Sequence, residues 1–256
     1  MRRSFFAALF AVLLAGMLYP QAQKNNSKST TTPTQQSKSF IDRVLDFLSI
    51  SYTPGAQKGP ASEITNGRIW VVDLKSGATR ALTTAGNYRS PIFLGGSGDI
   101  LALRGNDVVR IPSTGGDGAK IQSIEGIVKL VGAGGNEPAK VLVLLRNGSV
   151  SHPRVALLAV DTGSMTDLPY DPASSEDLQF VEDLEGWSRS YGQSRVYTKR
   201  QSKDSLAGTV EWSDVFLAVP GRQPLDVSQC DGVNCGQPSL SQDGNLLVYV
   251  KENPNS

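Results

Sequence analysis

The stretch Asp161-Thr162-Gly163-Ser164 contains residue types that could carry out proteolysis. Two apolar residues followed by Asp-Thr-Gly-Ser form the loop that holds the catalytic aspartate in aspartic proteases. That chemistry needs two aspartates that share one proton, each supplied by its own loop. The sequence has no second Asp-Thr-Gly or Asp-Ser-Gly, so a single chain would lack half of the site. We therefore expect Asp161 to be a turn residue and not a catalytic one.

No other catalytic set is complete in the sequence. His152 is the single histidine, so a Ser-His-Asp or Cys-His arrangement would depend on it alone. The glycine-rich stretch from Gly132 to Gly135 lacks the Lys-Ser/Thr pair of a phosphate-binding loop. The sequence thus predicts no catalytic residue, no cofactor and no enzyme activity.

Six carboxylates lie close together in the sequence and could offer oxygen ligands to Ca²⁺. They are Asp171, Glu176, Asp177, Glu182, Asp183 and Glu185. Their spacing lacks the fixed alternating positions of a calcium-binding loop. A solvated acidic face is therefore favoured, and no metal site is predicted.

The only two cysteines, Cys230 and Cys235, are separated by four residues. In an exported protein, an even number of nearby cysteines indicates a disulfide bond. Metal binding would need further Cys or His ligands, and a redox pair usually has two intervening residues. We predict one disulfide bond between Cys230 and Cys235.

The N-terminal part of the chain has the order of a secretory signal peptide. Arg2 and Arg3 precede the apolar run Phe5–Leu18, and a polar stretch follows. This run is shorter than the ~20 residues that a membrane span needs. We predict a signal peptide over residues 1–22 and a disordered polar tether over residues 23–38, with an uncleaved membrane anchor as the alternative. The protein is then periplasmic or secreted.

One pattern recurs four times along the rest of the chain. Each copy begins with a run rich in β-branched residues. The run ends in an apolar residue, which is followed directly by Asp or Pro and shortly afterwards by a glycine. The Asp or Pro positions are Asp73, Pro112, Asp161 and Pro220. Such a run followed by turn residues is typical of a β-hairpin. Asp161 thus shares its place with three other turn residues, which supports its assignment to a turn.

Two further runs accompany each hairpin. In the four repeats, the first of these runs begins at Gly96, Glu137, Tyr191 and Ser241. The second is a possible strand that precedes it, within residues 88–95, 126–132, 177–184 and 236–243. Each repeat then has four short antiparallel strands, as a β-propeller blade has. The longest repeat also contains a polar insert, Lys199–Trp212.

Two segments resemble a known repeat family. Pro238–Val250, with the sequence PSLSQDGNLLVYV, is similar to the WD40-like Asp-Gly repeat of the TolB-type β-propellers. Ile69–Thr84 is similar to the second half of that repeat, and the middle repeats keep less of the pattern. The resemblance extends over residues 64–256 and implies an all-β propeller.

The chain begins with the second half of one repeat and ends with the first half of another. Pairing residues 238–256 with residues 64–84 would complete one blade and close a ring. We therefore predict a propeller of four four-stranded antiparallel blades over residues 64–256. Because four is the low end of the ~4–8 blades found in propellers, an open half-ring that pairs with a second copy is the alternative.

A segment before the repeats, residues 39–51, predicts a short amphipathic helix capped by Ser39. Its apolar face is broad, and its polar face carries Asp42, Arg43 and Asp46. This polar face lacks the many Lys and Arg residues of a membrane-surface helix. We favour packing over one end of the propeller, with a partner-binding or membrane-surface helix as the alternative.

The function expected from these features is binding. The net charge is +1 and the Lys and Arg residues are scattered, so no nucleic acid is expected as a partner. A membrane would be involved only through an uncleaved signal segment. Propellers present loops on a rigid frame, and loops carry binding function. We predict an exported, non-enzymatic scaffold that binds a protein partner through exposed aromatic residues, namely Tyr88, Trp187, Tyr191 and Trp212. The alternatives are a carbohydrate or small-ligand receptor and a hydrolase with carboxylates at the channel mouth.

Overall fold

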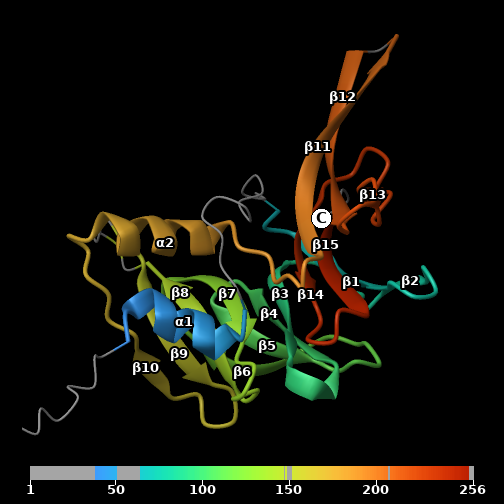
Figure 1. Cartoon of the computed structure of the whole chain (residues 1–256). Coiled ribbons are helices and arrows are strands. Elements are labelled where there is room, and N and C mark those ends of the chain that lie inside the picture. Colours follow the sequence, from blue (N-terminus) through green and yellow to red (C-terminus); the bar gives the residue numbers. More distant parts are fainter. Residues whose placement is uncertain (1–37, 51–63, 147, 149–151, 207, 254–256) are drawn as a thin grey trace, which may run out of the picture. The chain divides into compact units, whose positions relative to one another are not determined.

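The computed structural model describes residues 38–50, 64–146, 148, 152–206 and 208–253. The predicted signal peptide and all of the predicted tether except Lys38 lie outside the described residues. Within them, the chain forms two α-helices and fifteen strands, with one short 3₁₀ turn at Gly95–Ser97 (Figure 1).

Strands from the two ends of the chain pair with each other, as predicted. The terminal-strand sheet consists of β14 (Cys235–Leu240), β15 (Leu246–Glu252), β1 (Gly67–Asp73) and β2 (Thr79–Ala81). β1 and β15 pair antiparallel over their full length, from Gly67 opposite Glu252 to Asp73 opposite Leu246. This ladder satisfies backbone groups that both strands would otherwise leave exposed at an edge.

Two further four-stranded antiparallel sheets follow in chain order. The second sheet consists of β3 (Tyr88–Leu94), β4 (Asp99–Arg104), β5 (Asp107–Ile111) and β6 (Ala119–Ser123). The third sheet consists of β7 (Ile127–Ala133), β8 (Lys140–Leu145), β9 (Arg154–Ala159) and β10 (Met165–Asp167). A single pair, Gly67 opposite Tyr88, joins the second sheet to the terminal-strand sheet, so by hydrogen bonding these two four-stranded parts form one eight-stranded sheet. The strands predicted at residues 88–95 and 126–132 are therefore confirmed.

The last sheet has three strands and not four. This hairpin sheet consists of β11 (Arg195–Ser205), β12 (Gly208–Ala218) and β13 (Leu225–Asp226). The polar insert Lys199–Trp212 continues β11 and β12, which pair from Arg195 opposite Ala218 to Ser205 opposite Gly208. β13 pairs only with Phe216 and Leu217 of β12. The outer half of the hairpin therefore extends beyond the other strands (Figure 1).

The strand predicted at residues 177–184 is wrong, because this segment belongs to helix α2 (Ser175–Glu185). The Ser174 hydroxyl accepts a hydrogen bond from the Asp177 backbone N–H at 3.3 Å, which caps the helix. Phe180, Val181 and Leu184 are buried, and their spacing of three and four residues places them on one side of a helix.

A lysine from the third sheet holds the C-terminal end of α2. Lys129 Nζ donates hydrogen bonds to the carbonyl oxygens of Glu185 and Trp187, both at 2.6 Å. When it is protonated, this lysine also interacts favourably with the helix dipole.

Helix α1 (Phe40–Leu48) lies within the segment predicted to be helical, and Ser39 caps it as expected. The Ser39 hydroxyl accepts a hydrogen bond from the Asp42 backbone N–H at 3.1 Å. Phe40, Val44 and Leu48 are buried at intervals of four residues and form its apolar face.

The apolar side chains of each central strand alternate between two neighbouring layers. In β8, Val141, Val143 and Leu145 face the second sheet, whereas Leu142 and Leu144 face α1 and α2. In an extended strand, successive side chains point to opposite faces, so burial of both faces requires a continuous apolar run. The sequence VLVLL of β8 meets this requirement.

Four buried clusters define the order of the layers. The hairpin sheet packs on the terminal-strand sheet, which packs on the second sheet, which packs on the third sheet. The two helices cover the remaining face of the third sheet. The first helix packs on a face of the third sheet, and not over one end of a propeller as predicted from the sequence. The closed ring of four blades that the sequence predicts is not found in the part of the chain that the structure describes.

Candidate functional site

A polar cleft of about 930 Å³ opens where segments distant in sequence meet. It lies between the end of α1, the loop that joins β7 to β8, and the loop that joins α2 to β11. Its lining includes Ser49, Asn136, Arg189, Tyr191 and Gln242. Volumes of ~300–1,000 Å³ are typical of ligand-binding clefts.

Direct backbone packing fixes one wall of the cleft. The Gly135 backbone N–H donates to the Phe47 carbonyl oxygen at 2.8 Å. A Cβ atom on Gly135 would lie 2.0 Å from Ser49 Oγ, so a larger residue would push the loop away from α1. Gln242 Nε2 donates to the Gly134 carbonyl oxygen at 3.3 Å and ties the terminal-strand sheet to the same loop.

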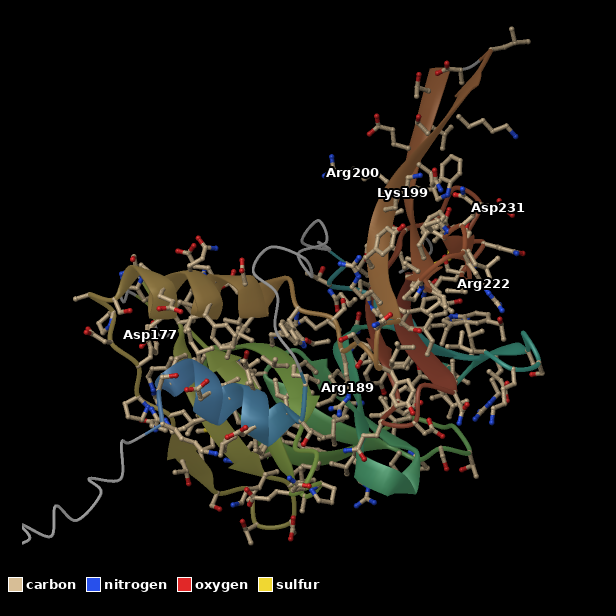
Figure 2. The ribbon with its side chains drawn as sticks, viewed as in Figure 1. Asp177, Arg189, Lys199, Arg200, Arg222 and Asp231 are labelled. Carbon is tan, nitrogen blue, oxygen red and sulfur yellow. A yellow bond between two sulfur atoms is a disulfide. The ribbon has the colours of Figure 1, made fainter. Side chains whose placement is uncertain are left out.

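The Arg189 guanidinium joins two of the elements around the cleft. Its Nη1 donates to the Ala133 carbonyl oxygen at 3.0 Å, and its Nη2 donates to the Leu48 carbonyl oxygen at 3.4 Å (Figure 2). Burial lowers the pKa of Arg189 below its ordinary value, but arginine keeps its charge in proteins. Five N–H donors in a fixed plane leave further donors for a carboxylate in the cleft.

Tyr191 presents an exposed ring whose position is fixed from behind. The side chain is 49% exposed. A Cβ atom on Gly244 would lie 2.3 Å from Tyr191 Cδ1, so the ring rests directly on that glycine. Tyr191 and Ser194 also exchange backbone hydrogen bonds at 3.1 and 2.9 Å, which hold the turn. An aromatic ring held in place loses little entropy when it binds a partner.

The four predicted contact residues do not share one surface. The expectation that Tyr88 and Trp187 are exposed is wrong, because they are 0% and 4% exposed. Tyr88 lies between the first two sheets, where its hydroxyl accepts a hydrogen bond from the Gly118 N–H at 3.3 Å. Trp187 packs with α1 and α2 just after the end of α2. Tyr191 lies in the cleft and Trp212 on the β11–β12 hairpin, and the binding roles of both stay predictions.

Trp212 belongs to a second surface, which we call the hairpin face. The face consists of side chains that alternate along the paired strands, namely Tyr197, Lys199, Gln201 and Lys203 of β11 with Phe216, Asp214, Trp212 and Val210 of β12. The rings of Tyr197 and Phe216 stack with centroids 5.9 Å apart, and Lys199 Nζ lies 5.3 Å from the centre of the Phe216 ring. Trp212 Nε1 donates to Asp214 Oδ2 at 2.6 Å. The inner part of this face is covered, since Phe216 and Asp214 are 8% and 3% exposed, whereas the outer residues Lys199, Lys203 and Val210 are exposed.

Asp161 lies in the turn between β9 and β10. The Gly163 N–H donates to the Ala159 carbonyl oxygen at 2.8 Å, and Gly163 has a φ of 69°. Ala159 N–H in turn donates to the Ser164 carbonyl oxygen at 2.8 Å. A glycine with positive φ closes such a hairpin turn. The four residues that match a protease loop thus close a β-hairpin.

The remaining sequence candidates lie apart from the cleft. Cys230 and Cys235 form a disulfide bond and are buried between the hairpin sheet and the terminal-strand sheet. Within the described residues, no group of three or more His, Cys, Asp or Glu side chains could hold a metal ion. No helix among the described residues is long and apolar enough to cross a membrane.

Comparison with known proteins gives distant likenesses. No protein-family model matches the sequence, and no curated protein matches it. A protein assigned as TolB from Agrobacterium tumefaciens is 12% identical with a TM-score of 0.37, over 72% of this chain and 60% of that chain. TolB from Acinetobacter baumannii is 11% identical with a TM-score of 0.34, over 73% of this chain and 44% of that chain. The isopeptidase AtxE2 is 14% identical with a TM-score of 0.27, over 72% of this chain and 27% of that chain.

At these TM-scores the likenesses do not establish a common fold. The chain spans less than two thirds of the length of each of these structures. Membership of the TolB-type family therefore stays a prediction.

Sequence reasoning missed the cleft, apart from Tyr191. Its walls come from residues 38, 45–50, 135–136, 189–192 and 242, which only the tertiary fold brings together. The single hint in the sequence is the glycine-rich loop from Gly132 to Gly135, because glycines often mark a close approach of backbone segments.

Proposed function

We propose that this chain is an exported, non-enzymatic β-propeller protein that binds a protein partner in the polar cleft. In this proposal the four sheets are successive blades, and α1 and α2 take the place of a further neighbour over the third sheet. The stacking of each sheet on the next through a buried apolar cluster supports this arrangement.

The observation that carries the proposal is a fixed ring beside a fixed cation in one cleft. Tyr191 rests on Gly244, and Arg189 is held by two backbone carbonyl oxygens. Tyr and Arg are the residue types that dominate protein-binding hot spots. Since arginine favours carboxylates in a planar arrangement, we propose that the partner offers an acidic side chain or a C-terminal carboxylate.

The lining of the cleft favours binding over catalysis. Asp46 is the one carboxylate among its described lining residues, and Lys38 Nζ lies 2.5 Å from Asp46 Oδ2. Hydrolysis by carboxylates would need a second acidic group across the cleft. Export is supported by the buried disulfide, because such bonds persist in oxidising compartments.

A carbohydrate or small-ligand receptor is the second candidate. The exposed Tyr191 ring shares the cleft with the side-chain amides of Asn136 and Gln242. An aromatic surface flanked by amide donors and acceptors also suits a sugar ring.

Affinity capture from the exported fraction tests the proposal. The bait is the purified protein, compared with Tyr191→Ala and with the control variant Leu225→Ala, which alters a 60% exposed side chain on β13. We expect one protein to be retained by the wild type and the control and lost with Tyr191→Ala. Equal retention by all three proteins would place the contact elsewhere. Saturable binding to a glycan array that Tyr191→Ala abolishes, without a retained protein, would favour the receptor.

A further inference from the structure

The charges around α2 and β11 are separated along the sequence. Residues 155–188 contain eight Asp or Glu residues and no Lys or Arg. Residues 189–203 contain five Lys or Arg residues and no Asp or Glu. Two adjacent segments of opposite charge attract each other or another copy of the chain.

The acidic charge is concentrated on the exposed side of α2. Asp171 before the helix and Glu176, Gln179 and Glu182 on it are exposed. The helix positions differ by three residues, so their side chains lie along one face. We call this surface, Asp171, Glu176, Gln179 and Glu182, the α2 face. No described Lys or Arg side chain forms an ion pair with its carboxylates.

The basic charge lies on the outer half of the hairpin. Lys199 and Lys203 are exposed on the hairpin face, and no carboxylate within the described ranges forms an ion pair with either of them. Beside them, Val210 is 48% exposed and Trp212 is half-buried. The outer half of the hairpin thus combines two exposed cations with one exposed aliphatic side chain and one half-buried aromatic side chain, and charged and apolar groups together suit a docking surface.

The two faces of one copy lie apart. Figure 2 shows Asp177 on α2 well separated from Lys199 and Arg200 on the hairpin. The short loop Gly186–Ser194 joins the two elements, and Arg189 in this loop is held by the carbonyl oxygens of Ala133 and Leu48. The attraction is therefore available to another molecule.

The spacing of the charges is compatible on the two faces. Lys199 and Lys203 are four strand residues apart, or ~13 Å at ~3.3 Å per residue. Glu176 and Glu182 are six helix residues apart, which is ~9 Å along the axis at ~1.5 Å per residue and ~120° around it, so their carboxylates are farther apart than the rise alone. Flexible lysine side chains can cover this difference.

We infer that the hairpin face of one copy docks on the α2 face of a second copy of this chain. Since each copy carries both faces, a two-fold arrangement makes the contact twice and closes the dimer. Lys199 and Lys203 then meet Glu176 and Glu182 of the second copy, and Val210 and Trp212 lose their exposure to water. These residues lie outside the cleft, so the inference goes beyond the proposed protein-partner function.

Charge reversal in two separate variants tests the dimer. The hairpin variant is Lys199→Glu with Lys203→Glu, and the helix variant is Glu176→Lys with Glu182→Lys. The wild type should sediment as a dimer at low salt and dissociate as salt rises. Each variant alone brings like charges together, so its dimer dissociation constant should rise by about a hundredfold or more.

The mixture of the two variants gives the decisive result. In a heterodimer, the acidic hairpin meets the basic helix of the other variant, and the basic hairpin meets the acidic helix. An equimolar mixture should therefore sediment as a dimer, although each variant alone is a monomer. Circular dichroism spectra equal to that of the wild type show that both variants are folded.

Three results would overturn the inference. They are a monomeric wild type at low salt, assembly into species larger than a dimer, and a mixture of the two variants that stays monomeric. Tyr191→Ala serves as a control, because it should leave the dimer unchanged. If the protein is monomeric but still captures a partner at the cleft, the dimer inference is wrong and the proposed function is unaffected.

Discussion

Replacement of Val44 by Ala measures how firmly α1 covers the third sheet. Val44 is 0% exposed and packs in a cluster with Leu142, Phe180 and Trp187. The change removes two buried methyl groups at ~0.8 kcal/mol each, and the residual cavity adds to this loss. The better helix propensity of Ala returns ~0.5 kcal/mol. We therefore expect the free energy of unfolding to fall by about 2 kcal/mol. At ~2.1 cal/mol/K per residue over roughly 200 residues, this lowers Tm by about 5 °C.

Guanidinium chloride unfolding followed by tryptophan fluorescence is a suitable assay, because Trp187 lies in the same cluster. Val210→Ala makes the same chemical change at a side chain that is 48% exposed on β12. Because Val210 lies in the inferred dimer contact, both variants are compared at a protein concentration at which the chain is monomeric. We expect this control to lose less than half as much stability, since little apolar area leaves the protein interior. Equal losses in both variants would refute the packing of α1 on the third sheet.

Three further predictions concern a titrating lysine, the disulfide and the support of Tyr191. Burial lowers the pKa of Lys129 to about 7 in the folded chain, whereas an unfolded lysine has a pKa near 10.4. Between these two pKa values the unfolded state binds more protons than the folded state, so the free energy of unfolding should rise with pH from about 7 to about 9. Unfolding curves of Lys129→Met, measured at several pH values, should lack this part of the rise. Reduction of the Cys230–Cys235 bond opens a short loop and should lower the free energy of unfolding by about 2 kcal/mol. An unchanged midpoint of denaturation in the presence of reductant would contradict this prediction. Gly244→Ala and Gly77→Ala introduce the same backbone strain, at φ of 68° and 74°, but only the first puts a Cβ atom 2.3 Å from Tyr191. Gly244→Ala alone should therefore abolish partner capture, and equal capture by both variants would mean that the ring needs no support.

Most strands could be predicted because their signals, apolar runs followed by turn residues, lie within short stretches of the sequence. Both faces of β8 are buried, so VLVLL is apolar throughout, and Asp161 and Gly163 mark a turn whatever surrounds them. The pairing of β1 with β15 followed from two half-repeats at the ends of one chain. Each of these features depends on neighbours in sequence or on repeat symmetry.

The errors arose where tertiary context decides. Residues 177–184 contain apolar residues at both strand-like and helix-like intervals, and the Ser174 cap with burial against α1 selects the helix. Tyr88 and Trp187 have the composition of contact residues, but the stacking of layers buries them. The extension of β11 and β12 escaped prediction because both faces of its outer half are exposed, which removes the apolar alternation.

The cleft could not be predicted because its residues are brought together by three separate layers. Arg189 has no sequence signal at all, since its role follows from the positions of the Ala133 and Leu48 carbonyl oxygens. The sequence predicts Tyr191 to be an exposed aromatic residue, but only the fold shows that Gly244 supports its ring.

Site-specific photocrosslinking tests the central claim that the cleft binds a protein. A photoreactive phenylalanine analogue replaces Tyr191 in the exported protein, and a second version carries it at Met165, which is 38% exposed on β10 and outside the cleft. After irradiation, position 191 should yield one discrete polypeptide adduct, and position 165 should yield none. The absence of an adduct at 191, or the same adducts from both positions, would contradict the claim.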